Sequence, residues 1–202
     1  IDAGRAFGTG HHETTMGCLK SLDQLRRTGH RFRNIADLGT GTGLLGFAAY
    51  HLWPDARIIA SDIDPVAVAV TEANAELNAI PLGNGRRHIR LVQSNGLDHP
   101  ALRNRAPFDL IIANILAGPL VALAPQIATA SAAGTVLLLA GLLTRQKNDV
   151  VRAYVREGFR LKHTHLDNEW PCLTLVKAKK YGWTRKPHRK KSPLASDYFG
   201  EC

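Results

Sequence analysis

Cysteine is scarce in this chain of 202 residues, and the three that occur, Cys18, Cys172 and Cys202, lie at unrelated spacings. Disulfide-stapled domains carry paired cysteines, and zinc sites place them in closely spaced pairs. Neither pattern is present, so the sequence predicts a reduced, intracellular protein, and we expect a cytoplasmic location and no metal. No secretory signal peptide is visible. Because the first residue is Ile1 rather than methionine, we expect a fragment of something longer.

Acidic residues are outnumbered, with 17 Asp and Glu against 26 Lys and Arg, for a formal net charge of +9. Eight of the basic residues lie between Lys177 and Lys191, a stretch without a carboxylate. Without these eight, 18 basic residues face 17 acidic ones, so the body of the chain is almost neutral. We therefore expect one folded domain over residues 1–179, followed by a basic, flexible tail over residues 180–202.

Charge is missing altogether from Leu110 to Thr144, a stretch long enough in principle to cross a bilayer. Polar residues, glycines and prolines interrupt it, at Asn114, Gly118, Pro119, Pro125, Gln126, Ser131 and Gly134. A strand–helix–strand unit of a buried parallel sheet explains this stretch better than a membrane span does.

Hydrophobic periodicity predicts seven strands and five helices. The strands are expected at Phe32–Leu38, Arg57–Ser61, Ile89–Gln93, Phe108–Ala113, Thr135–Ala140, Phe159–His165 and Cys172–Ala178. The helices are expected at His12–Arg27, Leu44–Leu52, Pro65–Asn78, Leu120–Ala130 and Thr144–Glu157. Five strands alternate with helices, and the short link between the last two strands favours an antiparallel pair. The predicted fold class is α/β, a Rossmann-like, mostly parallel, doubly wound sheet with a C-terminal antiparallel hairpin.

The segment from Gly41 to Gly46 is a literal GxGxxG, and Asp62 and Asp64 follow it by about 20 residues. Taken alone, this pattern suggests a dinucleotide such as NAD. A strand–helix turn that binds no ligand is the plainer alternative.

The residues around the loop favour a different ligand. Asp37 ends the first strand, and three glycines follow at alternate positions, Gly39, Gly41 and Gly43. An acidic residue before such a loop suits a ligand with a cationic end and no phosphate. Asp62, at the end of the second strand, can accept hydrogen bonds from both hydroxyls of a ribose.

Polar residues follow two further strands. The Asn95 amide could contact an adenine, although Asn95-Gly96 is equally an ordinary turn pair. Asn114 ends the fourth strand at the edge where open α/β sheets bind ligands, with a helix cap as the alternative.

Several motifs then occur in one order. They are Gly4-Arg5-Ala6-Phe7-Gly8-Thr9-Gly10-His11-His12-Glu13-Thr14-Thr15, Asp37 to Gly43, Asp62-Ile63-Asp64-Pro65, Ala113-Asn114-Ile115-Leu116-Ala117 and Glu169-Trp170. This order resembles the PrmA family of class I S-adenosylmethionine-dependent methyltransferases, over Ile1 to about Ala178. The resemblance implies methylation of lysine side chains and of an N-terminal amine on ribosomal protein eleven of the large subunit.

The resemblance implies S-adenosylmethionine contacts at Thr15, Gly39, Asp62 and Asn114. The full set expected to bind this cofactor is Phe7, Gly8, Thr9, Thr15, Asp37, Gly39, Gly41, Gly43, Asp62, Ile63, Asn95 and Asn114. Asn114 is also the expected catalytic residue. We expect the segment from Phe7 to His12 to close over the cofactor. His11, His12 and Glu13 could relay protons or simply begin a helix.

Ile115-Leu116 stand where enzymes that methylate planar amides or adenine carry Pro-Pro-aromatic, which favours a flexible amine as acceptor. Three features depart from the family: Ala3 replaces a usual proline, the N-terminal substrate domain has no counterpart in this chain, and the basic tail is additional. The tail leaves open a contact with ribosomal RNA through Lys177–Lys191, or a nucleic-acid methyltransferase. A methyltransferase of a non-ribosomal protein and a non-catalytic binding module are further alternatives.

Overall fold

A computed structural model describes residues 12–179 of the chain. Its strands are β1 (Asn34–Leu38), β2 (Arg57–Asp62), β3 (Ile89–Gln93), β4 (Phe108–Asn114), β5 (Ser131–Ala140), β6 (Phe159–Asp167) and β7 (Trp170–Lys177). Its helices are α1 (His12–Arg27), α2 (Leu44–Leu52), α3 (Pro65–Leu77), α4 (Pro100–Arg103), α5 (Ala117–Thr129), the 3-10 turn η1 (Thr144–Gln146) and α6 (Lys147–Arg156).

All seven strands form one sheet in the order β3-β2-β1-β4-β5-β7-β6. Strands β1 to β5 pair in parallel, while β7 pairs antiparallel with both β5 and β6. The final hairpin therefore inserts its second strand between β5 and β6. The α/β, doubly wound fold predicted from the sequence is confirmed.

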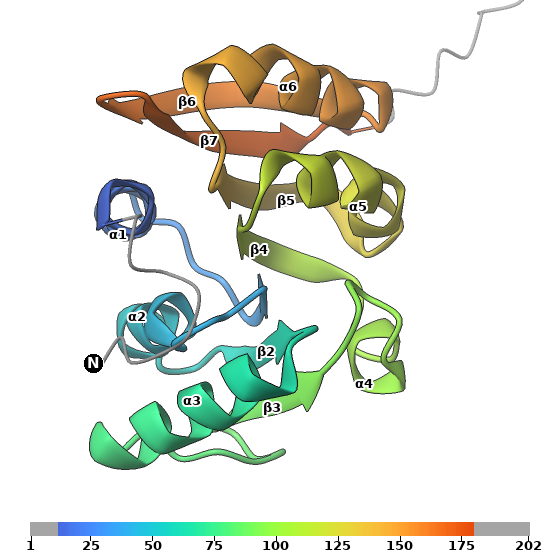
Figure 1. Ribbon diagram of the computed structural model, residues 1–202. Coiled ribbons are helices and arrows are strands. Elements are labelled where there is room, and N and C mark those ends of the chain that lie inside the picture. Colours follow the sequence, from blue (N-terminus) through green and yellow to red (C-terminus); the bar gives the residue numbers. More distant parts are fainter. Residues whose placement is uncertain (1–11, 180–202) are drawn as a thin grey trace, which may run out of the picture.

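Helices cover both faces of this sheet (Figure 1). Helices α1, α2 and α3 pack on one face, where Leu22 and Phe47 are buried against strand residues such as Ile58. Helices α4, α5 and α6 pack on the other, where Leu120 and Tyr154 are buried. Each face thus has its own hydrophobic core.

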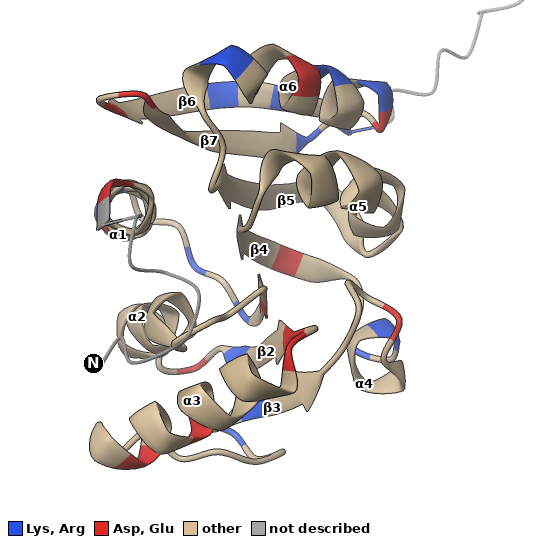
Figure 2. Cartoon of the chain, in the orientation of Figure 1, with Lys and Arg blue, Asp and Glu red and all other residues tan. Residues whose placement is uncertain are grey.

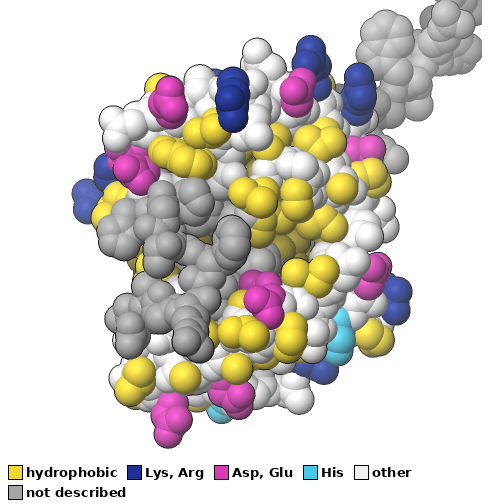
Figure 3. Space-filling view, viewed as in Figure 1, with side chains coloured by type: hydrophobic (Ala, Val, Ile, Leu, Met, Phe, Trp, Pro, Cys, Tyr) yellow, Lys and Arg dark blue, Asp and Glu magenta, His cyan; other side chains and the backbone are white. Residues whose placement is uncertain are grey.

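The uncharged stretch forms β4, α5 and β5, as the strand–helix–strand interpretation predicted. Figure 2 shows α5 and β5 without charged side chains, and Figure 3 shows hydrophobic side chains gathered over β4 and α5. Among the described helices, none has the length and apolar character that a bilayer crossing requires.

Several predicted boundaries were wrong by a few residues. Strand β1 begins at Asn34 rather than Phe32, and the amides of Arg33 and Asn34 donate to the carboxylate of Asp109 in β4. Helix α5 begins at Ala117, three residues early, since Pro119 is tolerated in the first turn of a helix.

Other differences are small. Strand β5 extends back to Ser131, β6 forward to Asp167 and β7 back to Trp170, while α3 ends at Leu77. The single turn α4 was not predicted.

Candidate functional site

The strand order reverses between β1 and β4, and this places a topological switch point at the carboxyl end of the sheet. Ligands of open α/β sheets bind in the crevice outside such a point. The glycine loop leaves β1 here, and Asn114 ends β4 beside it, with Leu38 paired to Ala113 across the two strands. The sequence predicted that these segments face one crevice, and the strand register brings them together.

The glycine loop needs its glycines for two different reasons. Gly39 has a φ of +70°, and a Cβ there would lie 2.2 Å from Cγ2 of Ile115, so only glycine fits beside that side chain. Gly41 also has a positive φ, but among the described residues nothing lies within 4 Å of the position its Cβ would take. Among residues 12–179, space for a ligand therefore remains beside the backbone of Gly41.

Asp37 lies beneath this loop and is 1% exposed. Its Oδ2 accepts hydrogen bonds from the Thr40 hydroxyl (2.7 Å) and from the Gly46 amide (2.9 Å). Burial raises the pKa of Asp37 from 3.8 to about 6, while the bonds from Thr40 and Gly46 oppose the shift and Asp62 adds to it. The carboxylate thus shapes the loop from inside and places a negative charge behind it when ionised.

Asp62 is half-buried at the end of β2 and accepts hydrogen bonds on both oxygens. Its Oδ2 accepts from the Gly41 amide at 2.9 Å, and its Oδ1 accepts from the Asp64 amide at 3.1 Å. A carboxylate offers about four lone-pair sites, so two acceptor sites are left for a ligand. Asp64 caps α3 by accepting from the Val66 amide at 2.8 Å, with Pro65 in the first turn, as predicted.

Asn114 and Thr15 are 99 positions apart in sequence and meet at the carboxyl end of β4. Nδ2 of Asn114 donates to Oγ1 of Thr15 at 3.3 Å, and both residues are half-buried. The alternative of a helix cap at Asn114 is wrong, because the N-cap of α5 is Leu116. Within residues 12–179 no donor contacts the Oδ1 atom of Asn114, so this atom is available as an acceptor.

Two predicted contact residues are exposed near the ends of β2 and β3. Ile63 follows Asp62 directly and is 62% exposed, an unusual position for a large apolar side chain. Asn95 is exposed in a turn in which its carbonyl accepts from the Asp98 amide (3.2 Å). The predictions at Phe7, Gly8, Thr9 and His11, and at the side chain of His12, lie outside the described residues.

Sequence reasoning missed Thr71 and Asn74 of α3. Thr71 is 0% and Asn74 3% exposed, and both donate to carbonyl oxygens of the glycine loop. With Ala67 and Ala75 they occupy the buried positions of the helix. One feature of the sequence could have identified Thr71 and Asn74: they are polar residues at positions where helical periodicity predicts apolar ones.

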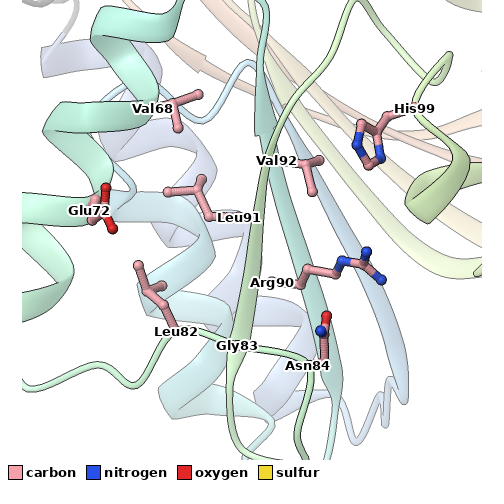
Figure 4. A pocket seen from close by; sticks show the side chains of 9 residues that line it. All are labelled: Val68, Glu72, Leu82, Gly83, Asn84, Arg90, Leu91, Val92 and His99. Carbon is pink, nitrogen blue, oxygen red and sulfur yellow. The ribbon is translucent and has the colours of Figure 1, made fainter.

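A separate hollow of about 540 Å³ lies along the outer edge of β3 (Figure 4). It is lined by Val68, Glu72, Leu82, Gly83, Asn84, Arg90, Leu91, Val92 and His99. None of these residues belongs to the predicted set. Within residues 12–179, no group of three or more His, Cys, Asp or Glu side chains is arranged to hold a metal ion.

Known proteins resemble this chain in sequence and in fold. A family model described as ribosomal protein L11 methyltransferase (PrmA) matches residues 1–178. The chain belongs to this family. A relative named ribosomal protein L11 methyltransferase from Mesorhizobium japonicum is 47% identical over 175 residues, which cover 87% of this chain and 58% of the relative. Another of the same name, from Agrobacterium fabrum, is 44% identical over 88% of this chain and 58% of its own length.

Solved structures match as well. The ribosomal protein L11 methylase of Lactobacillus delbrueckii subsp. bulgaricus aligns with a TM-score of 0.74 and 28% identity, covering 89% of this chain and 84% of that one. TrmK of M. capricolum, solved with S-adenosylhomocysteine, aligns with a TM-score of 0.58 over 80% of this chain and 69% of its own, and at 18% identity it shows the shared fold alone. This PrmA-family chain therefore has the class I methyltransferase fold, and it spans 58% of the length of the two named relatives.

Proposed function

We propose that this chain transfers methyl groups from S-adenosylmethionine to lysine side-chain and N-terminal amines of ribosomal protein L11. Membership of the PrmA family supports the substrate class. The observation that carries the proposal is the meeting of Thr15, Asn114 and the glycine loop at the switch point, with Asp62 beside the loop. The location would be the cytoplasm.

The residues of the crevice fit an S-adenosyl ligand. Asp62 has acceptor sites to spare for the two ribose hydroxyls, and exposed Ile63 offers an apolar surface for the adenine, with the Asn95 amide nearby. The open space at Gly41 admits the ligand to the backbone of the loop. Ionised Asp37 favours a cationic amino-acid end and the sulfonium. Phe7, Gly8 and Thr9 remain part of this proposed set.

Bound S-adenosylmethionine supplies an activated methyl group on a sulfonium. The chain's part is alignment, since the acceptor nitrogen must approach the methyl opposite the sulfur. Asn114 is the proposed catalytic residue because its Nδ2 donates to Thr15, and this bond fixes the orientation of the side-chain amide. The Oδ1 atom of Asn114 can then accept a hydrogen bond from an N–H of the incoming amine. Such an acceptor orients the nitrogen lone pair.

A lysine must lose a proton before it can attack. With an ordinary pKa near 10.4, the neutral amine costs about 4–5 kcal/mol at pH 7. Removal of water from the crevice favours the neutral form, as does a neighbouring positive charge. A single Oδ1 acceptor contacts one amine hydrogen at a time, so the nitrogen can rotate between successive transfers.

The proposal is tested with the purified chain, S-adenosylmethionine and purified ribosomal protein L11. Mass spectrometry should show additions of 14 Da confined to lysines and the N-terminus, which is about the mass that replacement of one hydrogen by a methyl adds. Asn114→Ala should reduce the rate strongly. Absence of methylation while S-adenosylhomocysteine binds would refute the proposed acceptor for this chain.

We further propose that the basic stretch Lys177–Lys191 contacts ribosomal RNA. Lys177 itself belongs to β7, where its Nζ donates to the Glu157 carbonyl (2.6 Å) and lies 4.6 Å from the Phe159 ring centre. The RNA contact therefore falls to the basic residues after it, which lie almost wholly outside the described part. A chain ending at Lys179 should lose RNA binding and keep methyl transfer to protein. Loss of transfer to an RNA acceptor instead would favour a nucleic-acid methyltransferase.

A further inference from the structure

Two buried polar side chains of α3 contact the glycine loop from below. The hydroxyl of Thr71 donates to the Gly41 carbonyl at 2.9 Å, and Nδ2 of Asn74 donates to the Thr42 carbonyl, also at 2.9 Å. The two side chains lie one helical turn apart, at i and i+3, and so share one face of α3. Consecutive carbonyls of the loop are thereby held by consecutive turns of one helix.

Burial makes these contacts consequential. Thr71 is 0% and Asn74 3% exposed. Water therefore cannot readily replace either loop carbonyl as the hydrogen-bond partner of these side chains, and breaking either bond costs free energy. Removing either donor would leave a loop carbonyl without that partner in a dry environment. The present conformation of the loop would then be less stable relative to the many others that its glycines allow.

The contacts also fix the direction of the loop's amides. In a trans peptide the C=O and the N–H point in opposite directions. Holding the Gly41 carbonyl on Thr71 therefore directs the Thr42 N–H away from α3. Among the described residues no acceptor contacts that N–H, whereas the Gly41 amide is occupied by Asp62 and the Gly43 amide by the Thr40 carbonyl.

We propose that Thr71 and Asn74 are positioning residues that hold the glycine loop in its ligand-binding conformation before the ligand arrives. They act through the carbonyls of Gly41 and Thr42 and do not touch the ligand. This inference rests on the proposed function for the identity of the ligand, an S-adenosyl compound. We call the hydrogen bonds from Thr71 and Asn74 to the loop carbonyls the clamp. Because a preorganised loop spares the ligand the cost of ordering the glycines, loss of the clamp should weaken ligand binding.

The test compares Thr71→Val and Asn74→Ala with matched controls. Thr135 is equally buried and donates its hydroxyl to the Phe108 carbonyl (2.6 Å), at the other end of the sheet. Asn34 donates its amide to the Arg105 and Pro107 carbonyls (2.6 and 2.9 Å), also far from the crevice. Thr135→Val and Asn34→Ala therefore remove the same kinds of hydrogen bond without touching the loop.

Calorimetry with S-adenosylhomocysteine measures affinity, and urea unfolding measures stability, for all variants of the full chain. Each loss of a clamp bond should raise Kd about tenfold, while the controls lose similar stability and keep Kd within about twofold. Thr71→Ser, which keeps the hydroxyl, should restore the affinity. Wild-type affinity in folded Thr71→Val and Asn74→Ala would overturn the proposal.

Amide hydrogen exchange of the ligand-free chain separates this inference from the proposed function. Exchange of the hydrogen-bonded loop amides, those of Thr40, Gly41 and Gly43, should accelerate at least about tenfold in the two clamp variants and not in the controls. If the wild-type chain failed to bind S-adenosylhomocysteine, the proposed function would fall, and the exchange rates alone would decide the clamp. Unchanged exchange in the loop would overturn the clamp whatever the affinity.

Discussion

Replacement of Asp62 by alanine removes the carboxylate on which the proposed ribose contact depends. In the ligand-free chain, Asp62→Ala deletes the bonds from the Gly41 and Asp64 amides, at 2.9 and 3.1 Å, from a half-buried residue. We expect a loss of about 1–2 kcal/mol in the free energy of unfolding. In the complex it deletes two charge-assisted bonds to hydroxyls as well, which should weaken S-adenosylhomocysteine binding by about 1–3 kcal/mol, or about 5- to 150-fold in Kd.

Titration calorimetry with S-adenosylhomocysteine gives the affinity, and urea unfolding shows that each variant is folded at the assay temperature. Asp64→Ala is the matched control, because that carboxylate lies two residues away and caps α3 through the Val66 amide. Its loss should cost about 1 kcal/mol of stability and leave Kd within about twofold. If Asp62→Ala bound as tightly as the wild type, the proposed ligand position would be wrong.

Three further changes probe the site. Gly39→Ala should lower the free energy of unfolding, measured by urea titration, by about 2–4 kcal/mol, because the new Cβ would overlap the Ile115 side chain. The control Gly29→Ala has a similar φ of +84° but open space around its Cβ among the described residues, so it should cost about 1 kcal/mol. Equal losses would contradict the close approach of Gly39 to Ile115. Because the pKa of Asp37 is raised from 3.8 to about 6, the folded chain holds that proton more tightly than the unfolded chain. The stabilisation that comes from protonated Asp37 is thus complete below pH 3.8, and about 3 kcal/mol of it is lost as the pH rises through 6. Urea titrations from pH 3.5 to 7.5 should show this decline in the wild type and not in Asp37→Asn. Parallel curves of unfolding free energy against pH for the two proteins would contradict it. Asn114→Ala should lower the methyl-transfer rate about 100-fold and raise the Kd for S-adenosylhomocysteine about fivefold or less, measured by single turnover and calorimetry; equal effects on both would show that Asn114 only binds.

The fold was predictable because its periodicity is strong. Strands β4 and β5 carry long apolar runs and helices α1 and α6 are amphipathic, so the alternation of strands and helices was visible in the sequence. The helix start at Pro65 was predicted correctly from Asp64, a local cap. The single turn α4 escaped notice because it is four residues long and is capped by His99, through Nδ1, rather than by a usual capping residue.

Contacts between distant segments were not predictable. The resemblance assigned Thr15 and Asn114 to one cofactor site, but the hydrogen bond between them was not predicted, because it depends on the packing of α1 beside β4. Likewise, the spacing of Cys18 and Cys172 along the chain gave no indication of the distance between their side chains. Their sulfur atoms lie 3.8 Å apart, buried between α1 and β7 as free thiols.

The central claim is methyl transfer to a ribosomal protein by this chain, and the most direct test is transfer of tritiated methyl from S-adenosylmethionine into a cell lysate. Samples digested with protease and with ribonuclease are run in parallel. We predict label in one ribosomal protein band that protease removes and ribonuclease leaves intact. Label that ribonuclease removes would contradict the account, as would the absence of label from a chain that binds S-adenosylhomocysteine.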